Sequence, residues 1–222
     1  MTNALNSACH VPRREVLFDA LLASALGLGS FWLYLATLAP TVLFADGGEL
    51  QFVPYILGIA HPTGYPLYLL LGWAWTHLLP IGDVAYRTNL FSAVWAALAV
   101  GFSYLVALRV IQRGVRGVNP VTVRLAAVTA AATFAVGQTF WGEAVIAEVY
   151  SFNAFFVALV LWLLFRVEEA PERTPPAPGR ISSFARRSLA LAAAYGLSLT
   201  HHVTMVLLMP GILIFLWLTN RQ

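Results

Sequence analysis

The chain has 222 residues, of which 59% are hydrophobic and only 10% carry a charged side chain. A soluble domain carries roughly a quarter charged residues, because its surface faces water. The apolar residues come in long blocks, which point to lipid as the solvent and argue against an ordinary soluble domain. The net charge of +3 does not indicate a nucleic-acid partner, because the basic residues form no single patch.

The basic residues predict how the chain sits in a membrane. All of them are arginines, and only Arg87 falls outside the segments that we place on one side. Such a bias indicates how a protein is oriented in the membrane, with the arginine-rich loops in the cytoplasm. We therefore expect an integral membrane protein of the bacterial inner (plasma) membrane with both termini cytoplasmic. The single cysteine, Cys9, leaves no intramolecular disulfide and no multi-cysteine metal site.

The N-terminal part predicts one spanning helix and then a large outer loop. After a cytoplasmic tail at 1–15, the apolar block 16–39 is long enough to cross a hydrocarbon core of roughly 30 Å. The outer loop covers 40–87. Its apolar piece 67–79 would span only about 20 Å, so we interpret it as an interfacial or re-entrant helix.

Further spanning helices are expected in the rest of the chain. They are separated by a basic loop, a short outer connection at 138–151 and a polar, proline-rich cytoplasmic linker at 167–184. The predicted fold is an all-α, polytopic membrane protein of about six transmembrane helices in one domain, 16–222. The expected spans are 16–39, 88–110, 121–137, 152–165, 187–200 and 203–218.

This topology gathers ionisable side chains on the outer side of the membrane. Such groups are costly near hydrocarbon and by default suggest a functional site. They are Asp46, Glu49, Asp83, Glu143, Glu148, His61, His77, Arg87, His201 and His202.

Several of these residues have two interpretations. Asp46 and Glu49 stand three apart, so a helix here puts them on one face. The same spacing fits a capping box, with Asp46 as the N-cap and Glu49 as its N3 partner. His61 begins a turn fixed by prolines and a glycine, where a structural role competes with a catalytic one. Arg87 either pairs with Asp83 or binds phosphate through its planar fork.

The second outer connection and the last interhelical turn add more candidates. Glu143 fits a solvated side chain, whereas Glu148 lies between apolar residues and is expected to be buried with a specific partner. His201 and His202 fit either a polar turn or a binding site. No metal-ligand spacing such as His-x-x-x-His occurs, so we assign no metal ligand or cofactor and leave a divalent cation open.

Five motifs, taken in order, resemble the membrane family called domain of unknown function 2723. This family is similar to the protein O-mannosyltransferases of the GT-C glycosyltransferase superfamily, and the resemblance covers about residues 15–215. The motifs are Asp46-Gly-Gly-Glu49, His61-Pro-x-Gly-x-Pro66-Leu-Tyr, Arg87-x-Asn89, Ala147-Glu-Val-Tyr150 and Gly196-Leu-x-Leu-Thr-His201-His.

The resemblance implies a GT-C-like core, a polyprenyl-phosphate-linked sugar as donor, and transfer on the outer face to a protein or glycan acceptor. It also implies an acidic catalytic base in the first outer loop, where Asp46 occupies the matching position and Glu49 is the nearest alternative. Such a transfer needs a base for the acceptor's proton and cations or donors for the leaving phosphate, and direct attack inverts the sugar. The candidates for substrate binding are His61, Arg87, Glu148, Tyr150, His201 and His202.

Two other classes of function remain open. Six expected helices are fewer than the seven or more of a GT-C module, which fits a truncated, non-catalytic subunit or a bundle completed by a further membrane chain. A transporter or flippase of a lipid-linked substrate predicts charges through the bilayer midplane. Here the ionisable groups concentrate at one face, which favours the glycosyltransferase.

Overall fold

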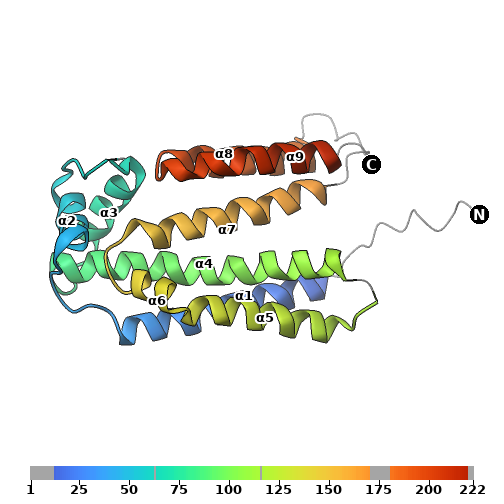
Figure 1. Ribbon diagram of the computed structural model, residues 1–222, viewed down its shortest axis with the longest axis horizontal. Helices are drawn as coiled ribbons and strands as arrows, with labels where there is room; N and C mark the ends of the chain where they lie inside the picture. The colour runs from blue at the N-terminus through green and yellow to red at the C-terminus, as the bar shows by residue number, and fades with distance from the viewer. Residues whose placement is uncertain (1–12, 63, 116, 171–180, 220–222) are drawn as a thin grey trace, which may run out of the picture.

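The computed structural model describes residues 13–62, 64–115, 117–170 and 181–219, and every regular element within these ranges is a helix. Most helices run lengthwise in an elongated bundle, and α2, α3 and α6 lie toward one end of it (Figure 1). The lengthwise elements are α1 (Arg13–Ala36), α4 (Val84–Gly114), α5 (Pro120–Val136), α7 (Val149–Glu168), α8 (Ser183–Leu199), the 3₁₀ helix η1 (Val203–Leu208) and α9 (Met209–Thr219). The helices at the end of the bundle are α2 (Ala45–Ile56), α3 (Pro66–Leu78) and α6 (Gln138–Ala144).

Three helices, α1, α4 and α7, are long and apolar enough to cross a membrane. Helices α5 and α6 pass the same test together, but they bend by 62° at the break between them. Over its described residues the protein is therefore an all-helical membrane protein with three candidate spans, or four if the bent pair is one span. The expected count of six is not confirmed, because α8 has only 17 residues and the apolar stretch Val203–Thr219 is equally short.

Several predicted boundaries were wrong. Helix α4 extends past the predicted 88–110 at both ends; Asp83 starts it early by accepting a hydrogen bond from the Tyr86 amide at 2.7 Å. The predicted span 203–218 begins instead as a 3₁₀ turn. The outer connection 138–151 is also not a plain loop, since it contains α6.

The tail and the linker fall largely outside the described part of the chain. Residues 1–12 are not described, and the described part of α1 starts at Arg13, so the predicted boundary between tail and membrane domain at residue 16 stays a prediction. Of the predicted linker 167–184, residues 171–180 lie outside the described residues. Its two ends are helical, because α7 continues to Glu168 and α8 begins at Ser183.

Helix α4 runs through the middle of the bundle and packs against α1, α5 and α7 (Figure 1). Two glycines allow α1 and α4 to approach closely. A Cβ atom on Gly27 would lie 3.0 Å from the carbonyl oxygen of Ala97, and one on Gly101 would lie 3.0 Å from that of Ala23. Small residues at such crossings are typical of helix packing in lipid, where van der Waals contact drives association.

A buried amide network joins α4 to the segments around it. Asn89 is fully buried; its Nδ2 donates to the Ala39 carbonyl at 2.8 Å, and its Oδ1 accepts from the Ala147 amide at 2.9 Å. The same Oδ1 accepts from Gln51 Nε2 at 2.8 Å. Gln51 also bonds to the Thr41 carbonyl at 3.2 Å. This network fixes the start of the outer loop, α2 and the segment before α7 on one helix.

We expect Asn89→Ala to destabilise the protein by about 2–4 kcal/mol, because it leaves several buried polar groups without partners. Thermal unfolding in detergent measures the change. Ser103→Ala, at a partly buried position of the same helix, is the control and should change stability by less than about 0.5 kcal/mol. Equal effects of the two substitutions would contradict the role given to Asn89.

Candidate active site at one end of the bundle

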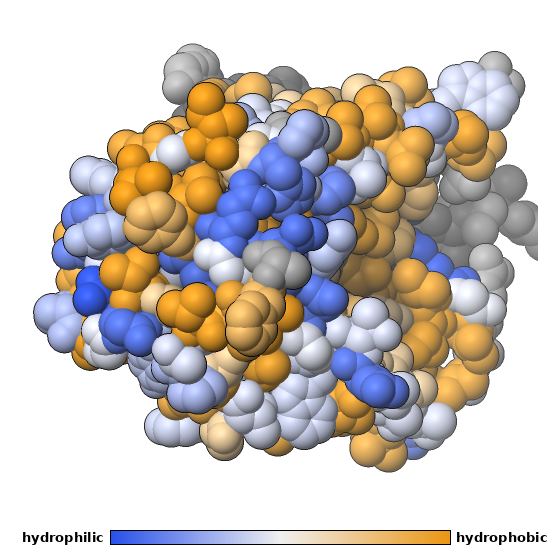
Figure 2. Space-filling model, turned by 60° about the vertical axis from the view of Figure 1, so that its left-hand side comes forward, coloured by the Kyte–Doolittle hydropathy of each residue, from blue (hydrophilic) through white to orange (hydrophobic). Residues whose placement is uncertain are grey.

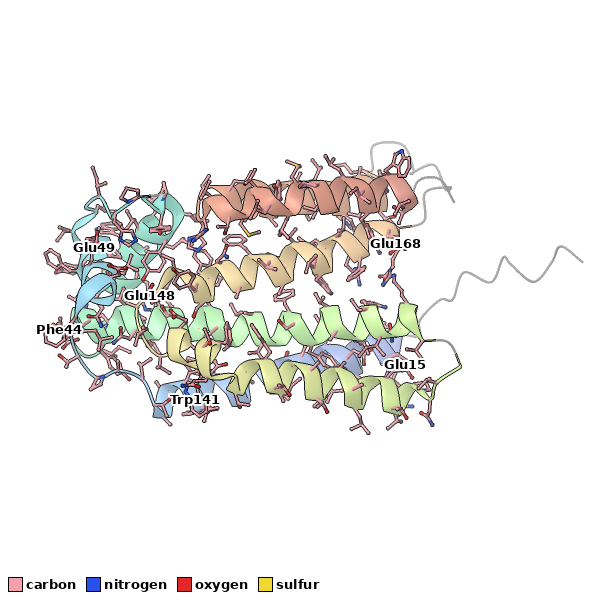
Figure 3. The ribbon with its side chains drawn as sticks, viewed as in Figure 1. Glu15, Phe44, Glu49, Trp141, Glu148 and Glu168 are labelled. Carbon is pink, nitrogen blue, oxygen red and sulfur yellow. The ribbon has the colours of Figure 1, made fainter. Side chains whose placement is uncertain are left out.

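Acidic and histidine side chains from distant segments meet at the end of the bundle that carries α2 and α3. Glu49 and Glu148 lie at this end, whereas Glu15 and Glu168 lie at the other (Figure 3). A hydrophilic patch surrounded by apolar side chains is visible there (Figure 2). Helix α8 reaches the same place, because the Leu67 amide at the start of α3 bonds to the Thr200 carbonyl at 3.3 Å. The predicted convergence is therefore present in the structure.

Helix α2 presents two carboxylates, but not as a capping box. The N-cap is Phe44, which makes no side-chain cap bond, so the interpretation of Asp46 as N-cap was wrong. Asp46 lies in the first turn and is exposed, and Glu49 follows one turn later. Glu49 turns to His61: its Oε1 accepts from the His61 amide at 2.8 Å, and its Oε2 lies 2.8 Å from the His61 Nδ1.

The Glu49–His61 contact is an ion pair. Its hydrogen bond raises the pKa of His61 and lowers the pKa of Glu49, so each partner favours the charged form of the other. Their side chains are 33% and 35% exposed, so both stay within reach of a substrate. Among the described residues, neither carboxylate oxygen of Asp46 accepts a hydrogen bond. The Glu49 carboxylate is thus hydrogen-bonded to His61, whereas the Asp46 carboxylate is open, that is, without a hydrogen-bond donor among the described residues.

The same three residues could hold a divalent cation. Ligand atoms of Asp46, Glu49 and His61 lie within 4.8 Å of one another. A cation bound through the His61 Nδ1 would replace the hydrogen bond between Glu49 and His61, because a metal-bound imidazole nitrogen cannot carry a proton. The geometry therefore offers a ligand set that competes with an existing ion pair.

Glu148 occupies the position just before α7 and is held there by α4. Its amide donates to Ser92 Oγ at 3.1 Å, and the Ser92 hydroxyl lies 3.2 Å from its carbonyl oxygen. Burial, followed by the charge of Glu143, raises the pKa of Glu148 to about 7. The charges of Asp46 and His61 also act on it, with opposite signs. A carboxyl group that titrates near neutral pH suits proton transfer or hydrogen bonding to a sugar.

The two neighbouring histidines have different roles. His201 is 1% exposed, packs on Phe152 with ring centroids 4.4 Å apart, and has its Nε2 3.0 Å from the Val149 carbonyl oxygen. Burial lowers the pKa of His201 to about 4, so His201 is neutral and links the end of α8 to α7 through this contact. His202 is half-buried, and its Nδ1 accepts from the Thr204 amide at 3.3 Å. That bond leaves the proton of a neutral His202 on Nε2, as a donor.

Tyr65 lies between His61 and His202, although it was not among the predicted site residues. Its hydroxyl lies 3.4 Å from the His61 Nε2, and its ring lies 5.6 Å from that of His202. Tyr150, from the start of α7, lies 6.3 Å from the His202 ring. Tyr65 also has a left-handed backbone (φ 44°), which is uncommon for a bulky residue. The signal in the sequence was the two prolines and the glycine that form its turn.

Of the two interpretations of Arg87, the ion pair with Asp83 is not present among the described residues, and the Asp83 side chain caps α4 instead. The Arg87 guanidinium group donates to three backbone carbonyls, those of Thr76 at 2.6 Å, Ile81 at 3.0 Å and Gly82 at 3.2 Å. These bonds secure the end of α3 and the turn that follows it. Binding of a phosphate by Arg87 remains a prediction, and it would have to compete with these bonds.

An open groove of about 1030 Å³ leads away from the site. It runs over α4, between α5 and α6 on one side and α7 on the other, and most of its lining is apolar. Tyr150, Glu143 and Asn153 line it too. Glu143 was expected to be solvated, but its Oε2 is buried without a partner among the described residues, as is the Oδ1 of Asn153. The groove therefore has polar groups within an apolar channel.

Comparison with known proteins identifies the family. The family model described as the N-terminal domain of protein O-mannosyl-transferase TMEM260 matches residues 46–222. This chain belongs to that family. The match confirms the predicted resemblance to O-mannosyltransferases, and it contains every predicted site residue from Asp46 to His202.

Two curated relatives carry the same description. The chain is 33% identical to protein O-mannosyl-transferase TMEM260 of Mus musculus over 173 residues, which are 77% of this chain and 22% of the mouse protein. It is 30% identical to the Dictyostelium discoideum protein O-mannosyl-transferase tmem260 over 133 residues, or 59% of this chain and 15% of that protein. The chain therefore spans about a fifth or less of the length of these relatives. No solved structure matches it.

The raised pKa of Glu148 predicts how stability depends on pH. The unfolded chain releases this proton near the ordinary value of 4.5, whereas the folded chain keeps it until about pH 7. The contribution of Glu148 to stability should therefore fall as the pH rises from 5 to 8. The raised pKa of His61 acts in the same direction, whereas the lowered pKa values of His201 and His202 act in the opposite direction. We expect Glu148→Gln to remove the part due to Glu148, so that the Tm of the variant relative to the wild type increases as the pH rises over this range.

Thermal unfolding in detergent across this pH range measures the slope. Asp83→Asn is the control, because asparagine caps a helix as well as aspartate does and Asp83 is exposed. This control should keep the wild-type slope. An unchanged slope in Glu148→Gln would contradict the assignment of the titration to Glu148.

Proposed function

We propose that this chain forms the catalytic end of a membrane protein O-mannosyltransferase. The reaction moves mannose from a polyprenyl-phosphate donor to a hydroxyl group of a protein on the outer face, with inversion at the sugar carbon. The proposal includes a GT-C-like arrangement of the helices and cytoplasmic arginine-rich loops. The observation that carries it is the open carboxylate of Asp46 beside the Glu49–His61 pair, in a chain of this family.

Asp46 is the better candidate for the base. Both oxygens of Glu49 are already engaged by His61, so its lone pairs are directed away from an incoming hydroxyl. Asp46 is exposed and lies on the same face of α2, one turn earlier. It can accept the acceptor's proton while the new oxygen–carbon bond forms and the bond from the sugar carbon to the phosphate oxygen breaks. Glu49 then acts by positioning His61.

The leaving phosphate needs positive charge and donors, which the site supplies without Arg87. The hydrogen bond from Glu49 raises the pKa of His61 and so favours its protonated form, and the His61 Nε2 lies next to the Tyr65 hydroxyl. His202 offers its Nε2 proton next to Tyr65 and Tyr150. Charge-assisted donors of this kind stabilise the negative charge that develops on a departing phosphate. Glu148, which titrates near pH 7, is placed to bond to the sugar.

The groove between α5 and α7 supports a donor with a lipid tail. It is open and mostly apolar, and Tyr150 of the site lines it. A polyprenyl chain in the groove would place its phosphate near the histidine and tyrosine side chains. The completion of the bundle by a further membrane chain remains a prediction, as does a requirement for a divalent cation.

We expect Asp46→Asn in the natural full-length protein to lower kcat for mannose transfer by about 10²–10⁴-fold, because the substitution keeps the shape and removes the base. Transfer from polyprenyl-phosphate mannose to an acceptor protein measures it. Glu49→Gln should cost less, since it weakens the ion pair and leaves the base in place. Asp83→Asn is the matched control and should keep wild-type activity, because asparagine preserves the N-cap of α4. Normal transfer by Asp46→Asn would reject Asp46 as the base.

A further inference from the structure

Tyr68 is a tyrosine at the active end whose hydroxyl group has no partner. It lies in the first turn of α3, and its side chain is completely buried. The hydroxyl oxygen makes no hydrogen bond among the described residues. An unpaired polar group in the interior costs free energy, so its presence in a native protein calls for an explanation. Phenylalanine would fill the same space without this cost.

The neighbours of Tyr68 place it beside Glu148. The Tyr68 ring packs edge-on against Phe91, with centroids 5.5 Å apart, and stacks on His201 at 6.3 Å. Ser92, which follows Phe91 in α4, accepts from the Glu148 amide at 3.1 Å. The His201 Nε2 lies 3.0 Å from the carbonyl oxygen of the residue after Glu148. The ring of Tyr68 thus contacts both segments that hold the backbone of Glu148.

The hydroxyl of Tyr68 is close enough to Glu148 for the charge of the carboxylate to act on it. Burial, and then the negative charge of Glu148, raise the pKa of Tyr68, whereas the Ser92 hydroxyl lowers it. The Tyr68 hydroxyl therefore keeps its proton throughout the neutral range. It is a permanent donor that faces an acid with a pKa of about 7.

Two acceptors lie near this donor, the Glu148 carboxylate and the Nδ1 of His201. The Nδ1 is also buried without a partner among the described residues. However, the His201 ring is stacked on that of Tyr68 at 29°, and a tyrosine hydroxyl lies in the plane of its own ring, so it is not directed at a stacked neighbour. The carboxylate is a charged acceptor, which forms the stronger hydrogen bond. The Glu148 side chain can also rotate toward Tyr68, whose ring is fixed by packing.

We propose that Tyr68 is a positioning residue for Glu148, and that its hydroxyl donates a hydrogen bond to the Glu148 carboxylate when this group is ionised. The bond favours the ionised form, as the charge of His61 does. It opposes burial and the charges of Glu143 and Asp46, which favour the protonated form. In the transfer reaction the bond would fix the direction in which the carboxylate meets the sugar. That role rests on the proposed function, whereas the contact itself does not.

A double-mutant cycle in thermal unfolding tests the contact, on the protein in detergent between pH 5 and pH 8. At pH 5 Glu148 is protonated, and we expect Tyr68→Phe to leave Tm nearly unchanged. At pH 8 the ionised carboxylate lacks its donor. The midpoint of the Glu148 titration should then lie about one pH unit higher, and Tm should fall by about 2–4 °C relative to the wild type. In the Glu148→Gln background, the effect of Tyr68→Phe should be the same at both pH values.

Tyr34→Phe is the matched control. Tyr34 is also completely buried, but its hydroxyl donates to a backbone carbonyl, that of Ala135, at 2.9 Å. This control should change Tm equally at pH 5 and pH 8. An effect of Tyr68→Phe that is independent of pH, as in the control, would overturn the proposal. So would a pH-dependent effect that persists in the Glu148→Gln background, because the partner would then be another group.

The role of Tyr68 in transfer needs a separate measurement on the natural full-length protein. Tyr68→Phe should move the part of the kcat profile that Glu148 governs to higher pH by about one pH unit, and Glu148→Gln should abolish this movement. A successful cycle together with normal transfer by Asp46→Asn would retain the contact and reject Asp46 as the base. A failed cycle in a protein that needs Asp46 for transfer would reject the contact alone.

Discussion

The buried amide of Asn89 is the interaction on which the arrangement of the active end depends. In lipid no water is present to satisfy backbone groups outside helices, so each irregular segment must find its partners within the protein. Asn89 meets this requirement for the chain that leaves α1 and for the chain that enters α7, and it bonds to Gln51 of α2 as well. One side chain of the central helix thereby holds together the segments that carry Asp46, Glu49 and Glu148.

This support allows three carboxyl groups to have different chemical states within one site. Glu49 is held as an anion by His61, and the carboxylate of Asp46 is open. Glu148 has a pKa raised to about 7 by burial. Sites that transfer protons typically give neighbouring acids different pKa values through their different environments. The division of roles in the proposed transfer follows from these differences: Asp46 as base, Glu49 as positioning residue and Glu148 as a sugar contact.

Two mostly apolar grooves follow the central helix. One leads from the candidate active site along α5 and α7, where buried oxygen atoms of Glu143 and Asn153 have no partner among the described residues. The other follows α1 and α4 and meets a charged pocket at the arginine-rich end. The polyprenyl donor proposed above would therefore have its phosphate at the active end of the bundle, away from the arginine-rich end. The central helix α4 contributes to both grooves without sharing a residue between them.

The sequence by itself determined that the chain lies in lipid, that it is helical, at which end the ionisable groups meet, and which family it resembles. These features follow from apolar blocks, charge bias and ordered motifs, which are local properties of the chain. Only the tertiary structure decided which partners these groups take. Glu49 bonds to His61, twelve residues away, instead of completing a cap, and Arg87 binds carbonyls instead of Asp83. His201 is a buried tie to Val149, whereas its neighbour His202 faces the site. Such choices depend on contacts between segments far apart in the chain, and helical periodicity contains no information about them.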